Sequence, residues 1–167
     1  MATAYLEIAA VLDAVAPRLG VAVEQLYSRV RLHQLEEALD RPGQHINGVE
    51  LYESLPEKLV AMAEALVTSR PFPRGNPAAA AVTMMMMAEL NGFELRIEDD
   101  ADAAALSRHL QTLASGRPDD LLAWVNAGLE AAAEPDDLDL NLFVAEPMTS
   151  PRAASSAFKF FHFCGKA

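Results

Sequence analysis

The sequence predicts a mainly α fold: a helical bundle around a central buried helix at about residues 77–90, with little or no β structure. Two observations favour this class. Apolar side chains recur at helical spacing along most of the first 133 residues, and turn-forming residues separate these periodic segments. In addition, the segment 78–88 is apolar on nearly every side, which is typical of a helix enclosed by others.

The N-terminal third is expected to contain two helices and a loop. Residues 5–19 show helical spacing and end at Gly20. Residues 23–39 predict a second helix, with its apolar positions towards the core and its glutamates outside. Segment 40–48 contains two glycines, a proline and polar turn formers, so we expect a loop there.

Helices are also expected at 52–68, where Pro56 fits the first turn, and at 77–90, which Asn91-Gly92 should end. The last two helices are predicted at 101–114 and 119–133, with Asp119 or Asp120 as the N-cap of the second.

Any β structure should be small. The two candidate places are a hairpin around residues 44–51 and an extended stretch at 93–97.

Composition indicates one domain and narrows the choice of partners. With 167 residues, of which 51% are hydrophobic, the chain can bury a real core. A net charge of −11 disfavours nucleic acid and anionic membranes as partners. The lone Cys164 excludes an intrachain disulfide. Apolar runs too short for a bilayer and an N-terminus unlike a signal peptide predict a cytoplasmic protein.

The segment from Ser69 to Ala80 has the form of an active-site loop that leads into a helix. Pro71, Phe72, Gly75 and Asn76 match the loop of the Fic/Doc (death-on-curing) family, which reads His-Pro-Phe-x-Asp/Glu-Gly-Asn-Gly/Lys-Arg. Further similarity covers roughly residues 1–133 and lies at 5–12, 51–60, 89–95 and 119–129. The chain therefore resembles this family, and the resemblance implies a Fic/Doc-like bundle.

The chain departs from the family where the resemblance would place reactive groups. Arg70 replaces the histidine base, and an arginine stays protonated and cannot accept a proton. Arg74 replaces the acidic magnesium ligand and would repel the ion. Pro77 and Ala78 replace residues that engage phosphates. We therefore predict no catalytic residue, no metal and no cofactor; ATP and Mg²⁺ are implied only if transferase activity survives.

Two interpretations of the loop remain open. In the first, the retained residues start a helix, with Asn76 as N-cap and Pro77 at the first helical position. In the second, Arg70 and Arg74 add positive charge to the helix N-terminus and form an anion site. The residues of this degenerate motif are Arg70, Phe72, Arg74, Gly75 and Asn76.

Other candidate residues give weaker signals. Met84 to Met87 point in successive directions around a helix, so they indicate core packing rather than a metal site. By the resemblance, the loop with His45, Ile46 and Asn47 corresponds to the family's flap, which aligns the target segment; a plain surface histidine is the alternative. A carboxylate is the alternative candidate for the lost base. For Glu50, Glu53, Glu57 and Glu64, however, the default interpretation is an exposed helix carboxylate.

The C-terminal part is expected to form a linker (134–151) and an aromatic, basic tail (152–167). The tail either folds back on the acidic domain, binds another protein, or is a substrate. In the last case residues 137–143 look like the recognition stretch in the leader of ribosomally made peptide precursors, notably lanthipeptides. The residues for modification would be Thr149, Ser150, Ser155, Ser156 and Cys164.

The sequence predicts a catalytically degenerate Fic/Doc-like protein that acts as a protein- or peptide-binding module. Its partner is a protein or a peptide, with the chain's own C-terminal tail as one candidate. Two alternatives remain: a precursor of a ribosomally synthesised, modified peptide, and a Doc-like toxin that transfers phosphate or a nucleotide to a protein hydroxyl.

Overall fold

The computed structural model describes residues 3–132, so the predicted linker (134–151) and tail (152–167) lie outside it. In the described range, the chain forms a mainly helical fold with two small antiparallel sheets, which confirms the predicted class. In chain order the elements are α1 (Ile8–Leu19), α2 (Val23–Tyr27), α3 (Leu32–Asp40), the 3-10 helix η1 (Arg41–Gly43), β1 (His45–Ile46), β2 (Val49–Glu50), α4 (Leu55–Ser69), α5 (Asn76–Leu90), β3 (Phe93–Leu95), α6 (Asp100–Leu113), α7 (Pro118–Gly128) and β4 (Leu129–Ala131).

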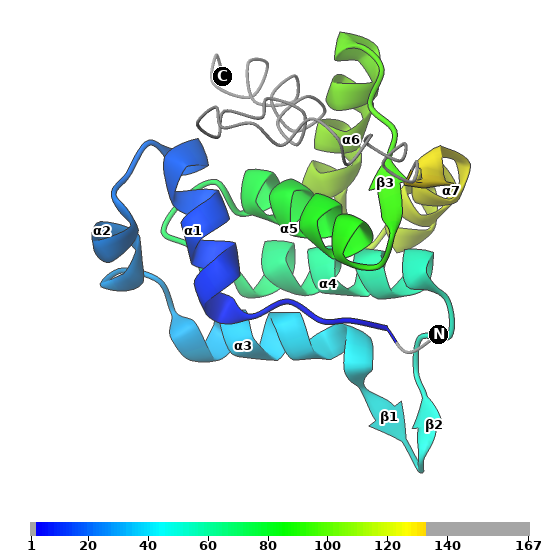
Figure 1. Cartoon of the computed structure of the whole chain (residues 1–167), viewed down its shortest axis with the longest axis horizontal. Coiled ribbons are helices and arrows are strands. Elements are labelled where there is room, and N and C mark those ends of the chain that lie inside the picture. Colours follow the sequence, from blue (N-terminus) through cyan, green and yellow to red (C-terminus); the bar gives the residue numbers. More distant parts are fainter. Residues whose placement is uncertain (1–2, 133–167) are drawn as a thin grey trace, which may run out of the picture.

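Helix α5 is the central element and packs against α1, α4 and α6 (Figure 1). Its side chains are buried on nearly every side, as its uniformly apolar sequence predicts. Met84, Met85 and Met87 are buried in the core, which confirms the packing role predicted for the methionines. The bundle is thus assembled around the helix that follows the loop at residues 70–75.

Helix α1 begins later than the sequence predicts. The expected start was Tyr5, whereas the first helical residue is Ile8. The backbone of Ala4 pairs with the side chain of Asn91: the Ala4 N–H donates to Asn91 Oδ1 at 2.8 Å, and Asn91 Nδ2 donates to the Ala4 carbonyl at 2.9 Å. This pairing holds Ala4 outside the helix, while Gly20 ends α1 as predicted.

The single helix predicted at 23–39 is wrong, because residues 28–31 separate α2 from α3. The N–H of Arg31 donates to the carbonyl of Pro71 at 2.9 Å instead of continuing a helical ladder. The side chain of Val30, which lies within this break, is buried. The interruption is therefore a tertiary effect that no glycine or proline at 28–31 announces.

The two predicted β regions are both present. Asn47 and Gly48 adopt positive φ angles of 54° and 82° in the two-residue turn between β1 and β2. Such a turn matches the twist of a hairpin. The hairpin projects from the body of the molecule beside the start of α4 (Figure 1).

The helix predicted at 119–133 is too long at its C-terminal end. Helix α7 runs only from Pro118 to Gly128, and residues 129–131 form β4, which pairs with β3. The predicted cap by Asp119 or Asp120 is also wrong: both lie in the first turn, Arg117 is the N-cap, and it makes no side-chain cap bond. The backbone groups of residues 129–131 form their hydrogen bonds with β3. They therefore do not need a further helical turn to provide partners.

Candidate functional site

Residues 70–75, which carry most of the predicted motif, form the loop that joins α4 to α5, and we call it the motif loop. Contacts with distant elements fix its path. Arg70 ends α4 in a left-handed conformation with φ of 51° and is exposed. Pro71 and Phe72 are buried, and the Pro71 carbonyl accepts the hydrogen bond from Arg31 at the start of α3. The aromatic side chain of Phe72 is only 2% exposed. Phe72 is therefore a core residue and is not available to a ligand.

Asn76 closes this loop through a pair of buried hydrogen bonds. The N–H of Phe72 donates to Asn76 Oδ1 at 3.0 Å, and Asn76 Nδ2 donates to the Phe72 carbonyl at 2.9 Å. The prediction that Asn76 is the N-cap is wrong: Gly75 is the N-cap, Asn76 is the first helical residue and Pro77 the second. Its amide satisfies the Phe72 backbone and so does not cap the helix.

Gly75 and Arg74 hold the loop against the end of α1. Gly75 has a φ of 71°, and a Cβ atom built at this position would collide with Cδ2 of Leu19. Arg74 Nη2 donates to the Leu19 carbonyl at 3.1 Å, which occupies one of the free acceptors at the end of α1. Of the five residues predicted for the degenerate motif, four therefore position the loop, and Arg70 alone among them has no such contact in the structure described.

The predicted flap residues lie in the β1–β2 hairpin. His45 and Ile46 form β1, and Asn47 is the first residue of the turn. Ile46 is 58% exposed and Val49 opposite it is 63% exposed, so the hairpin presents apolar side chains to solvent. His45 Nδ1 lies 2.8 Å from the Gly43 carbonyl. The hairpin precedes α4 and the motif loop follows it, so the two predicted sites lie towards opposite ends of this helix.

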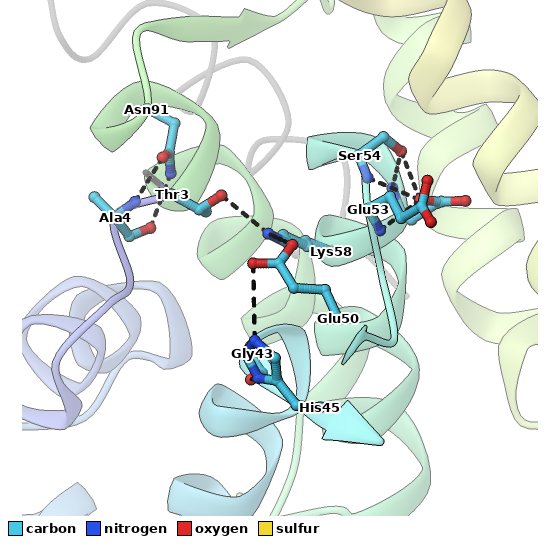
Figure 2. A network of polar contacts seen from close by, with 10 residues as sticks. Thr3, Ala4, Gly43, His45, Glu50, Glu53, Ser54, Lys58 and Asn91 are labelled. Atoms are coloured by element: carbon cyan, nitrogen blue, oxygen red, sulfur yellow. Dashed lines mark hydrogen bonds and ion pairs between the residues drawn. The ribbon is translucent and has the colours of Figure 1, made fainter. Parts of the chain in front are cut away.

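A buried lysine anchors the hairpin, and sequence reasoning missed it. Lys58 on α4 is 3% exposed, and its Nζ donates to Glu50 Oε2 on β2 at 3.0 Å and to Thr3 Oγ1 at 3.1 Å. Figure 2 shows this side chain reaching towards both partners, with His45 on the far side of Glu50. The one signal in the sequence is a lysine directly before the apolar run of α4.

The pKa of Lys58 reflects two opposing effects. Burial alone lowers the pKa of the ammonium group, but the hydrogen bond and charge of Glu50, together with Tyr5, outweigh it and leave the pKa above its ordinary value. Lys58 therefore stays charged at neutral pH, and the ion pair joins the hairpin, α4 and the N-terminal segment.

The four carboxylates considered as substitute bases have other positions or partners. Glu50 lies on β2 and Glu53 in the segment before α4, so the expectation that both are helix carboxylates is wrong. Glu57 forms a capping box with Ser54, and the hydrogen bonds from Ser54 lower the pKa of Glu57. Glu64 lies on α4 in the wall of the groove described next.

A groove with a volume of about 530 Å³ runs between α3 and α4. It extends from Gln44, at the base of the hairpin, to Thr68 and Ser69, directly before Arg70. Three carboxylates line it, from Glu37, Asp40 and Glu64. Its lining therefore includes the residues that directly precede the two predicted sites, Gln44 before His45 and Ser69 before Arg70.

One cation also lies in the groove wall. Arg41 is exposed, and its Nε donates to the hydroxyl of Tyr52 at 3.0 Å. The carboxylates outnumber this guanidinium, so the groove is acidic and favours a cationic ligand.

The residues predicted for modification, Thr149, Ser150, Ser155, Ser156 and Cys164, lie outside the described range. Within residues 3–132, no group of three or more His, Cys, Asp or Glu side chains is arranged to hold a metal ion. No helix in this range combines the length and the apolarity needed to cross a membrane. Comparisons of the chain with protein-family models, with curated proteins and with solved structures gave no match.

Proposed function

We propose that this chain is a catalytically degenerate Fic/Doc-like protein that binds a basic protein or peptide segment in the groove between α3 and α4. The observation that carries the proposal is the groove itself, because it is open and lined by the carboxylates of Glu37, Asp40 and Glu64. An extended segment with lysine or arginine side chains would find complementary charge along its length. Two small side chains, Ala38 and Ala65, also line the groove and leave room for a backbone.

The hairpin adds a second means of holding an extended segment. Strands β1 and β2 pair only with each other in the structure described, so the outer edge of each offers free backbone groups. A peptide can add to such an edge as a further strand. The exposed side chains of Ile46 and Val49 would supply apolar contacts, and Lys58 holds the hairpin in place.

The internal contacts of the motif loop support binding rather than transfer chemistry. A phosphoryl-transfer site needs groups that position the phosphates and neutralise their charge. Here the side chain of Asn76 bonds the backbone of Phe72 inside the loop. Gly75 and Arg74 hold the loop against Leu19. Arg70 cannot act as a base.

The chain's own tail has the chemistry that this groove would select. Residues 152–167 carry Arg152, Lys159 and Lys166 among four phenylalanines, and contain no carboxylate side chain. A basic segment of a separate protein has the same chemistry, so the experiment must distinguish the two sources.

Site-specific photo-crosslinking in the full-length chain tests the proposal. A benzophenone amino acid replaces Thr68 in the groove, and in a control it replaces Thr112, an exposed threonine near the end of α6. We expect the Thr68 probe to give a crosslink to a lysine- or arginine-rich segment, identified by mass spectrometry. An intramolecular product identifies the tail, and an intermolecular product identifies a separate partner.

Charge variants provide the matched control. Glu37→Lys places a cation in the groove, whereas Glu36→Lys makes the same change on the exposed neighbouring residue, which does not line the groove. Glu37→Lys should reduce the crosslink about threefold or more, and Glu36→Lys should leave it within about 1.5-fold. Equal labelling from Thr68 and Thr112, or equal effects of the two glutamate variants, would refute the proposal.

The transferase alternative has its own test. The full chain is incubated with labelled ATP, Mg²⁺ and a cell lysate, and transfer to protein is compared with that of Arg70→Ala. Arg70 is exposed, and its one hydrogen bond in the described part of the chain is that of its backbone N–H to the Leu66 carbonyl, which alanine retains, so this variant should fold normally. Transfer that disappears in Arg70→Ala would establish enzymatic activity and overturn the binding proposal.

A further inference from the structure

A second hollow lies between the end of α1, α2 and the motif loop. Its volume is about 220 Å³. Leu19, Val21, Leu26 and Pro73 provide an apolar lining, and Arg29 and Arg74 also line it. An apolar hollow flanked by two guanidinium groups favours a ligand that combines apolar side chains with carboxylates.

Neither arginine has a carboxylate partner in the part of the chain that the structure describes. Arg74 donates to the Leu19 carbonyl, and the side chain of Arg29 has no hydrogen bond or ion pair there. Both residues are exposed, in a chain whose net charge is −11. The two guanidinium groups are therefore available to carboxylates.

One segment of this chain has the matching chemistry. Residues 137–143 read Asp-Leu-Asp-Leu-Asn-Leu-Phe, so leucines alternate with polar residues. In an extended conformation this alternation would place Leu138, Leu140 and Leu142 on one side and the polar side chains on the other. From 134 to 151 the chain contains five carboxylate residues and no lysine or arginine.

The length of chain after β4 allows this segment to reach the hollow. The N–H of Ala132 donates to the carbonyl of Gly92, which places residue 132 near the C-terminal end of α5. The hollow lies near its N-terminal end, since Arg74 precedes α5. Helix α5 is about 22 Å long at 1.5 Å per residue. The ten residues 133–142 span about 33 Å when extended, so Leu140 and Leu142 are both within reach.

We propose that the hollow lined by Leu19, Val21, Leu26 and Pro73, with Arg29 and Arg74 at its sides, binds residues 137–143 of the same chain. The leucines occupy the apolar lining, and the aspartates pair with the two arginines. This proposal does not rest on the acidic groove between α3 and α4, which selects the opposite charge. It assigns a docking site to the acidic, apolar run that the sequence singled out.

Disulfide trapping in the full-length chain tests this assignment. In a Cys164→Ser background, Val21→Cys is combined in turn with Leu138→Cys, Leu140→Cys and Leu142→Cys. The control combines Thr112→Cys with the same three partners. After mild oxidation we expect an intramolecular disulfide between position 21 and at least one leucine position, with a yield about tenfold above the control because docking raises the effective concentration.

A charge exchange supplies a second, independent measurement. Arg29→Glu should reduce the yield about threefold, and added Asp139→Lys should restore it. Arg108→Glu, which makes the same change at an exposed arginine on α6, should have no effect. Equal yields for positions 21 and 112, insensitivity to Arg29→Glu, or disulfides that join two chains would each overturn the proposal.

Discussion

The side chain of Asn76 and the backbone of Phe72 are joined by two reciprocal hydrogen bonds, of 3.0 Å and 2.9 Å. Asn91, at the other end of α5, pairs with the backbone of Ala4 in the same way. At each end of the central helix, an asparagine side chain therefore bonds one donor and one acceptor of a non-helical segment. At the N-terminal end this contact determines the path of the motif loop.

Asn76→Ala should lower the free energy of unfolding by about 3 kcal/mol, because it leaves the buried N–H and carbonyl of Phe72 unpaired. Urea unfolding measures the change. Asn126→Ala is the matched control, since Asn126 on α7 is exposed and makes one bond, to the Leu122 carbonyl. The control should change stability by no more than about 0.5 kcal/mol. Similar losses in the two variants would contradict the role assigned to Asn76.

Gly75→Ala should destabilise the protein for two separable reasons. The positive φ costs about 1 kcal/mol for a residue with a Cβ, and contact with Leu19 adds about 1 kcal/mol more. Gly116→Ala isolates the first cost, because Gly116 has a φ of 78° and no heavy atom within 4 Å of its Cβ position. Gly75→Ala should therefore cost about 1 kcal/mol more than Gly116→Ala, and this extra cost should disappear when Leu19→Ala removes the contact. Thermal unfolding of Gly75→Ala, Gly116→Ala, Leu19→Ala and the Gly75→Ala/Leu19→Ala double variant measures the difference.

Replacing Glu50 and replacing Lys58 both break their ion pair, but the two substitutions should lower the free energy of unfolding by different amounts. Glu50→Ala leaves a buried ammonium with Thr3 and Tyr5 near it but no carboxylate, and should cost about 2 kcal/mol. Lys58→Met keeps the apolar packing and leaves Glu50 half exposed, so it should cost less. Hydrogen exchange of the β1–β2 amides should rise in both variants. Unchanged exchange would show that the pair does not hold the hairpin.

Alkaline pH should remove the contribution of Lys58. Because the pKa of Lys58 is raised in the folded protein, its contribution is present in full below the ordinary lysine pKa of about 10.4 and is lost as the pH rises through the folded-state value. The difference in unfolding free energy between the wild-type chain and Lys58→Met should therefore shrink above about pH 10.4. A difference that stays constant would contradict the raised pKa.

Acid should remove the contribution of the capping box at the start of α4. Hydrogen bonds from Ser54 lower the pKa of Glu57, so this contribution is present above the ordinary glutamate pKa and is lost as the pH falls through the lowered value. The stability difference between the wild-type chain and Glu57→Gln should decline between about pH 5 and about pH 2. Glu36→Gln, on an exposed face of α3, should show no comparable decline.

Local sequence patterns predicted much of the fold. The buried α5 follows from apolar residues on every side, and the ends of α1 and α5 follow from Gly20 and Asn91-Gly92. The hairpin follows from turn formers at 47–48. These features depend on the residues within one segment, and so a single segment is sufficient to indicate them.

Other features depended on backbone groups far away in the sequence. The break before α3 uses the Pro71 carbonyl, the late start of α1 uses Asn91, and the end of α7 uses β3. Lys58 is buried because Glu50 and Thr3 meet it. No pattern within one segment specifies such partners.

The sequence by itself determined that the protein is mainly α, that α5 is its buried centre, and that the loop before α5 carries Arg70 and Arg74 but neither histidine nor carboxylate. Tertiary structure decided what the remaining loop residues do and where open surface lies. The physical reason is that helical periodicity and turn chemistry are local properties. The partner of a buried amide, carbonyl or ammonium group is fixed only when distant segments pack together.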